Sequence, residues 1–178
     1  EAAAHNLTPV VLELGGKSPC IIDSTANLKI AARRVAWGKT LNAGQTCIAP
    51  DYILIHEDVK EAFIREFAAA VEYLHGSDIK QSQHFVRMVS DKAFERVTGY
   101  LKDGTIVYGG RTDSSDRFIE PTLLDNVSPD APVMTDEIFG PIFPMIPFDN
   151  REEVLKFIRE REKPLALYYF GKTGNGKE

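Results

Sequence analysis

The fold is decided by residues 20–55, which read CIIDSTANLKIAARRVAWGKTLNAGQTCIAPDYILI. The short apolar run at residues 20–23 predicts a strand, and the apolar side chains of residues 28–41 recur at helical spacing. Residues 42–44, Asn-Ala-Gly, are typical of a helix end, and the apolar residues 52–55 predict a second strand. Strands that alternate with helices in this way indicate an α/β arrangement with a largely parallel sheet.

The rest of the chain continues this alternation, without internal repeats or a linker. Further helices are predicted over residues 59–74, 85–101 and 150–161, and further strands over residues 9–14, 105–108, 118–124, 141–148 and 164–170. We therefore expect one α/β domain, residues 1–178, built on a largely parallel sheet.

Composition excludes several classes of protein. The 178 residues are 43% hydrophobic and 26% charged, with a net charge of -5, which is ordinary for a globular domain and offers no basic surface for nucleic acid. No apolar run approaches the ~18 residues that cross a bilayer. The two cysteines make no disulfide framework, which favours a reducing compartment such as the cytoplasm. The chain begins without Met inside a predicted helix, and we expect it to be a fragment.

Residues 13–19, Glu-Leu-Gly-Gly-Lys-Ser-Pro, place a carboxylate at the end of a predicted apolar strand. The paired glycines allow a sharp turn or a close approach to a ligand, and the carboxyl ends of strands are where open α/β sheets carry their sites. Glu13 is therefore a candidate general base. Taken alone, Glu13 is better explained as a strand-end carboxylate beside an ordinary turn, and Lys17 as a solvated structural lysine.

Residues 44–47, Gly-Gln-Thr-Cys, follow the predicted helix end directly. A cysteine on a loop among small and polar residues can ionise and be reached, so Cys47 is a candidate nucleophile. Burial as a small apolar side chain is the alternative. Cys20 lies in a strand pattern, for which packing is the expected role.

Residues 137–141, Glu-Ile-Phe-Gly-Pro, place an acid and an aromatic ring two residues apart before a turn. The Glu137 carboxylate could bind sugar hydroxyls and the Phe139 ring could face a flat heterocycle. An exposed acid and a core phenylalanine are an equal alternative for this stretch.

Together the three stretches resemble the aldehyde dehydrogenase superfamily, whose signatures they match in order and in separation over essentially the whole chain. Residues 47–52, Cys-Ile-Ala-Pro-Asp-Tyr, and 161–168, Arg-Glu-Lys-Pro-Leu-Ala-Leu-Tyr, resemble its class 3 branch, which includes medium-chain and fatty aldehyde enzymes. The resemblance implies a three-layer domain, an open and largely parallel sheet with helices on both faces. It also implies oxidation of an aldehyde to a carboxylic acid with NAD or NADP and no metal.

The resemblance also implies a role for each matching residue. Cys47 attacks the aldehyde and carries a thiohemiacetal and then a thioester, and Glu13 activates the water that releases the acid. Glu137 holds the nicotinamide ribose and Phe139 packs near the nicotinamide, while Leu14 and Gly15 border the cofactor through their backbone.

The family pattern further implies that residues 1–178 form an incomplete catalytic domain. The cofactor-binding domain and the C-terminal oligomerisation segment are absent from this chain, so we expect the chain alone to be inactive and the full-length protein to form a homodimer. A membrane anchor, found in some class 3 members, would lie in a C-terminal tail.

Three other functions compete with this interpretation. The nearest alternative is a branch of the superfamily that passes the acyl group to coenzyme A or acts on a phosphorylated aldehyde. The acyl-transferring branch tends to lack the glutamate found here at Glu13. A thiol hydrolase needs a histidine beside its cysteine, but His5, His56, His75 and His84 all lie outside the three stretches. A catalytically silent protein could share the fold, because fold alone does not establish function.

Overall fold

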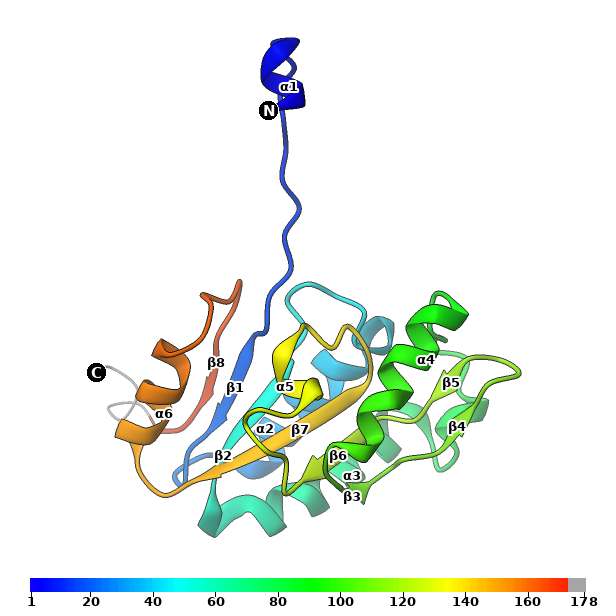
Figure 1. Ribbon diagram of the computed structural model, residues 1–178. Helices are drawn as coiled ribbons and strands as arrows, with labels where there is room; N and C mark the ends of the chain where they lie inside the picture. Colours follow the sequence, from blue (N-terminus) through cyan, green and yellow to red (C-terminus); the bar gives the residue numbers. More distant parts are fainter. Residues whose placement is uncertain (173–178) are drawn as a thin grey trace.

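The computed structural model describes residues 1–172, and most of them form one α/β domain (Figure 1). Six strands form its sheet in the order β3-β6-β7-β2-β1-β8, with only β3 antiparallel to its neighbour. The strands are β1 Pro19–Ile22, β2 Tyr52–His56, β3 Thr105–Tyr108, β6 Thr122–Asp125, β7 Ile142–Phe148 and β8 Tyr168–Phe170. A separate hairpin joins β4, Thr112–Asp113, to β5, Phe118–Ile119.

Helices connect the strands, and several of their ends lie at residues that favour helix caps. The Asn27 side chain caps the start of α2, and Gly76, at a φ of 84°, follows the end of α3. The Asn150 side chain caps the helix that begins at Arg151, because it accepts a hydrogen bond from the Glu153 N–H at 3.1 Å. The helices are α1 Ala2–His5, α2 Leu28–Thr40, α3 Lys60–His75, α4 Asp91–Gly99, α5 Pro132–Thr135 and α6 Arg151–Arg159. Single 3-10 turns are η1 Leu41–Gly44, η2 Glu57–Val59, η3 Ile79–Gln81 and η4 Tyr100–Lys102.

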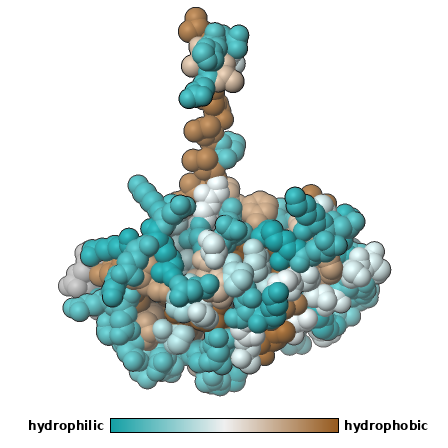
Figure 2. Space-filling model, viewed as in Figure 1, coloured by the Kyte–Doolittle hydropathy of each residue, from teal (hydrophilic) through white to brown (hydrophobic). Residues whose placement is uncertain are grey.

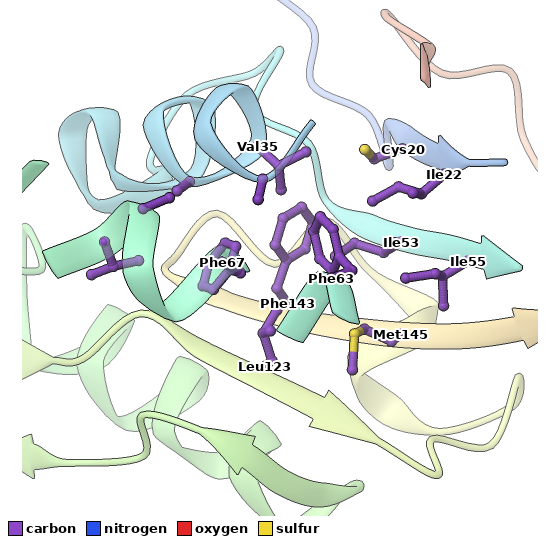
Figure 3. Close-up of a cluster of buried hydrophobic side chains, with 14 of the residues drawn as sticks. Cys20, Ile22, Val35, Ile53, Ile55, Phe63, Phe67, Leu123, Phe143 and Met145 are labelled. Carbon is purple, nitrogen blue, oxygen red and sulfur yellow. The ribbon is translucent and has the colours of Figure 1, made fainter. Parts of the chain in front are cut away.

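Alternate residues of each central strand pack on opposite faces of the sheet. In β2, Ile53 and Ile55 pack under α2 and α3, together with Phe63 and Phe67 (Figure 3). Leu54 lies on the other face, with side chains from α4, α5 and α6. Burying each large apolar side chain contributes about 1.5–3 kcal/mol, so both faces need helices. The predicted three-layer fold with helices on both faces is confirmed.

Residues 9–14 do not form the predicted strand. They form an extended arm that projects from the domain, with an exposed fraction of 84% at Val11 (Figures 1 and 2). Their apolar, β-branched sequence favours a strand, but none of the described strands pairs with them. A strand pattern can be read from sequence, whereas the pairing that completes it depends on another segment.

Three other predicted elements are shorter in the structure. The strand predicted over residues 164–170 is formed only by β8, Tyr168–Phe170. Residues 85–90 are not helical, because their backbone bonds elsewhere: the Val89 N–H donates to the Gln45 side chain and the Met88 N–H to the Arg117 carbonyl. The predicted strand at residues 118–124 is divided between β5 and β6 at Pro121, which has no N–H to donate.

The described helices include none that combines the length and apolar character needed to span a bilayer.

Candidate active site

The loop that carries Cys47 begins with a left-handed turn at the end of α2. Asn42, Ala43 and Gly44 have φ values of 51°, 53° and 72°. The Asn42 side chain donates to the Gln45 carbonyl at 2.8 Å, and the Gln45 side chain donates back to the Asn42 carbonyl at 3.0 Å. Gln45 also accepts from the Val89 N–H at 2.9 Å. These bonds hold the backbone that leads into Cys47.

The two cysteines differ as the sequence predicts. Cys47 is half-buried on its loop, and within residues 1–172 its N–H donates no hydrogen bond, so it could stabilise an oxyanion. Cys20 is fully buried in β1, and this burial raises the pKa of its thiol, which leaves it protonated and inert.

Glu137 and Phe139 lie on the loop between α5 and β7. Glu137 is half-buried: burial raises the pKa of its carboxyl, and the Gly16 N–H that bonds to it offsets part of this shift. A Cβ placed on Gly15 would lie 2.1 Å from Glu137 Oε2, so the turn and the carboxylate are in close contact. Phe139 is 37% exposed and has a φ of 48°, an uncommon backbone conformation for a non-glycine residue.

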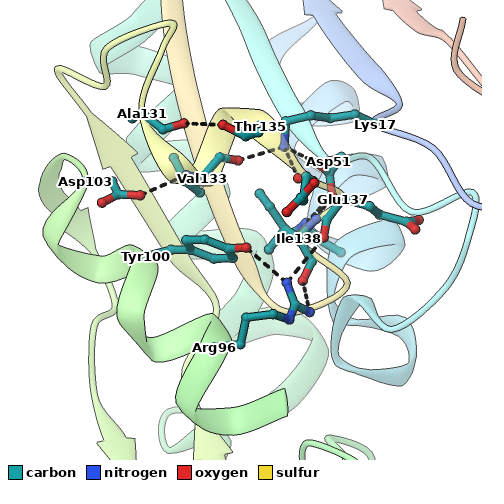
Figure 4. A network of polar contacts seen from close by, with 12 residues as sticks. Lys17, Asp51, Arg96, Tyr100, Asp103, Ala131, Val133, Thr135, Glu137 and Ile138 are labelled. Atoms are coloured by element: carbon teal, nitrogen blue, oxygen red, sulfur yellow. Dashed lines mark hydrogen bonds and ion pairs between the residues drawn. The ribbon is translucent and has the colours of Figure 1, made fainter. Parts of the chain in front are cut away.

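The three stretches converge in space although they are far apart in sequence. Gly15 meets Glu137, as described, and a Cβ placed on Gly44 would lie 2.4 Å from the Gly140 carbonyl oxygen. The Lys17 Nζ donates to Asp51 Oδ2 at 2.6 Å (Figure 4). The loop that carries Cys47, the Glu137 carboxylate and the exposed Phe139 ring therefore lie in the same region of the domain.

Glu13 and Leu14 lie on the arm and are exposed. Among the described residues, Glu13 makes no hydrogen bond or ion pair, so no contact holds it against Cys47. The expectation of a solvated Lys17 is wrong. Its side chain is 13% exposed, because the ammonium reaches Asp51 and also donates to the Val133 and Asp136 carbonyls at 2.7 and 3.0 Å.

The contacts of two further residues near the candidate site were not predicted from the sequence. Arg96 of α4 donates to the Glu137 carbonyl at 3.3 Å and to the Ile138 carbonyl at 2.8 Å. The Tyr168 hydroxyl donates to the Ile48 carbonyl, directly after Cys47. No local pattern around either residue marks these contacts, since each joins segments more than 40 residues apart.

An apolar groove with a volume of about 570 Å³ runs beside Cys47, between α2 and β8. Thr46 and Ile48, the neighbours of Cys47, both line it. Trp37 lines it too and is 57% exposed, which is a large apolar surface to leave in water.

The histidines of the chain do not pair with Cys47. The His75 ring bonds to the Thr40 hydroxyl at 2.9 Å, and His56 lies 3.7 Å from Asp58. Because no described histidine bonds to Cys47, the contacts do not favour a thiol hydrolase.

The side chains at the site fit the chemistry of a nicotinamide dinucleotide. Glu137 offers a carboxylate acceptor for ribose hydroxyls, and Phe139 offers an exposed ring face to a flat heterocycle. The described residues contain no group of three or more histidine, cysteine or acidic side chains that could hold a metal ion.

Comparisons with known proteins agree with this geometry. The sequence profile described as the aldehyde dehydrogenase family matches residues 1–175. The chain is 49% identical to aldehyde dehydrogenase family 3 member A2 of Pongo abelii, over 96% of this chain and 35% of that protein. It is 47% identical to the dimeric NADP-preferring aldehyde dehydrogenase of Rattus norvegicus, over 95% of this chain and 37% of that protein. Its structure matches a substrate-bound state of Staphylococcus aureus AldH with a TM-score of 0.93 and 47% identity, over 98% of this chain and 38% of that one.

Proposed function

The chain belongs to the aldehyde dehydrogenase family, and we propose that it forms the catalytic part of an enzyme that oxidises an aldehyde to a carboxylic acid with NAD or NADP. Its relatives are class 3-like. The main support for this proposal is that three segments lie together: the hydrogen-bonded loop that carries Cys47, the Gly15–Gly16 turn and the Glu137 loop. The chain spans 35–38% of the length of these relatives, so the proposal concerns the complete enzyme.

In the first half of the reaction, the Cys47 thiolate attacks the aldehyde carbon. A sulfur–carbon bond forms, and the carbonyl oxygen becomes an oxyanion that the Cys47 N–H is free to stabilise. Bound NAD or NADP supplies the hydride acceptor, so that collapse of the oxyanion leaves a thioester on Cys47. Glu137 would hold the ribose of this acceptor and Phe139 would pack near its nicotinamide ring, and together they would orient it.

In the second half, Glu13 accepts a proton from a water molecule that attacks the thioester carbon. The carbon–sulfur bond breaks, the acid is released, and Cys47 returns as a thiolate. Glu13 lies on an exposed arm, so its approach to Cys47 belongs to the complete enzyme. Leu14 and Gly15 border the cofactor through their backbone.

The apolar groove supports a medium- or long-chain aldehyde as the substrate. Its lining includes the neighbours of Cys47 together with the apolar side chains of Trp37, Leu41 and Leu167, which an alkyl chain could contact. Each buried methylene contributes about 0.8 kcal/mol, so a chain of several carbons would gain affinity along this surface.

Residues 1–178 are proposed to be a catalytic domain without its cofactor-binding domain or oligomerisation segment. The exposed apolar side chains of the arm support this, because such side chains are normally covered by another part of a protein. The chain alone would then not turn over. The dimeric relative of Rattus norvegicus supports a homodimer as the form of the complete enzyme. Two free cysteines support a cytoplasmic location.

A burst experiment tests the proposed function. The complete enzyme is mixed with NAD or NADP and aldehydes of increasing chain length, and NADH or NADPH absorbance is followed in the first turnover. Cys47→Ala should abolish the burst, whereas Cys20→Ala, at a buried cysteine, is the matched control and should retain it. An unchanged burst in Cys47→Ala would rule out Cys47 as the nucleophile.

A further inference from the structure

Asp51 lies where the three stretches of the site meet. It follows Cys47 by four residues, and its side chain is 3% exposed. Its Oδ2 accepts from the Lys17 Nζ at 2.6 Å, which ties it to the segment after Gly15 and Gly16. Its Oδ1 accepts from the Ile138 N–H at 3.0 Å, which ties it to the Glu137 loop (Figure 4). One carboxylate therefore joins the nucleophile segment to both other segments.

The backbone around Glu137 is held by charged side chains on both sides. Lys17 binds the Asp136 carbonyl, Asp51 binds the Ile138 N–H, and Arg96 binds the Glu137 and Ile138 carbonyls. Hydrogen bonds to charged groups are stronger than neutral ones. Figure 4 shows the Glu137 side chain extending away from Arg96. These bonds hold the backbone, whereas the Glu137 carboxylate lies against the Gly15–Gly16 turn and accepts from the Gly16 N–H.

Asp51 is also the counter-charge for two buried ammonium groups. Besides Lys17, the Lys39 Nζ lies 4.0 Å from Asp51 Oδ1 and has no hydrogen-bond partner among the described residues. Burial lowers the pKa of Lys17, and it lowers the pKa of Lys39 to about 8. Without the Asp51 charge, two buried cations would face each other, which is strongly unfavourable.

We propose that Asp51 is a positioning residue for hydride transfer, because it fixes the Glu137 loop relative to the Cys47 segment. This inference rests on the proposed function. Asp51 does not touch the reacting atoms: it acts by keeping the Glu137 carboxylate and the Phe139 ring where the cofactor needs them. Its loss should slow the step that depends on this alignment more than it affects Cys47 itself.

The test compares two properties of Asp51→Asn in the complete enzyme. The rate of NADH or NADPH formation in a single turnover reports the alignment, and alkylation of Cys47 by iodoacetamide without cofactor reports the thiol. We expect hydride transfer to fall at least ~10-fold and alkylation to stay within about twofold. Asp125→Asn is the matched control: Asp125 is buried and pairs with Lys60 at 2.8 Å, away from the Glu137 loop. It should leave both rates within about twofold of wild type.

Each outcome decides the proposal. Unchanged hydride transfer, or an equal fall in both rates, would overturn it. If Asp51→Asn fails to fold, Arg96→Met releases the Glu137 loop from α4 instead and should produce the same separation of the two rates. If hydride transfer and alkylation change equally in Arg96→Met, the proposed role of Asp51 is overturned. A wild-type enzyme that reduces no cofactor with any aldehyde would instead overturn the proposed function, before any Asp51 variant is measured.

Discussion

Gly15→Ala should impair hydride transfer while barely affecting stability. The new Cβ would lie 2.1 Å from Glu137 Oε2, whereas an ordinary contact begins at about 3.4 Å, so the carboxylate must move by about 1 Å. Only the end of a flexible side chain has to move, and Gly15 itself is exposed. The free energy of unfolding should therefore change by less than about 1 kcal/mol.

The functional effect should be much larger. A displacement of about 1 Å in a positioning group can cost ~10²-fold in rate, or about 2.7 kcal/mol in the activation barrier. Single-turnover formation of NADH or NADPH in the complete enzyme measures this loss, and denaturant unfolding measures the stability. Gly99→Ala is the control, because a Cβ there would meet nothing within 4 Å.

A double variant shows whether Gly15 acts through Glu137 or by direct contact with the cofactor. If it acts through Glu137, Gly15→Ala combined with Glu137→Gln should be no slower than Glu137→Gln alone. Additive losses in the double variant would refute this reasoning, as would a Gly15→Ala enzyme with hydride transfer within twofold of wild type.

Three further predictions concern the same region. Lys39→Met should raise the pKa of Glu137 further, because the Lys39 ammonium lowers it; the acid limb of the pH profile for hydride transfer should then move to higher pH, and an unmoved limb would contradict this. Tyr168→Phe removes the hydroxyl that donates to the Ile48 carbonyl and should lower the free energy of unfolding by ~1 kcal/mol, measured by denaturant titration, and an unchanged free energy would contradict this. Trp37→Ala should reduce the preference in kcat/KM for long-chain over short-chain aldehydes by about tenfold, as losing ~1.4 kcal/mol of apolar contact implies, and an unchanged preference would show that the alkyl chain binds elsewhere.

The central strands and helices could be predicted because their signals are local. The helix at Leu28–Thr40 follows from apolar side chains at helical spacing, and the strands at Pro19–Ile22 and Tyr52–His56 follow from short apolar runs with clear ends. Residues 85–90 could not be predicted, since their backbone bonds to Gln45 and Arg117, far along the chain.

The sequence predicts the individual residues of the site, but not the long-range contacts that join their segments. The positions of Cys47, Glu137 and Phe139 on loops follow from the flanking glycines and helix end, and their roles come from the family resemblance. The burial of Lys17 depends on Asp51, which lies 34 residues away, and no local pattern indicates that pair. Long-range ion pairs of this kind become visible only when the fold brings their segments together.

Trapping the acyl-enzyme tests the central claim most directly. Glu13→Gln removes the proposed base but keeps the side chain's size, so the complete enzyme should stall after hydride transfer, since loss of a base typically slows a step by ~10²–10⁴-fold. The variant is mixed with aldehyde and NAD or NADP, quenched in acid and digested, and its peptides are mapped by mass spectrometry. We predict an acyl group on Cys47 in near-stoichiometric amount, together with about one equivalent of reduced cofactor. Reduced cofactor without an acyl group on Cys47, or with the acyl group on another residue, would contradict the account.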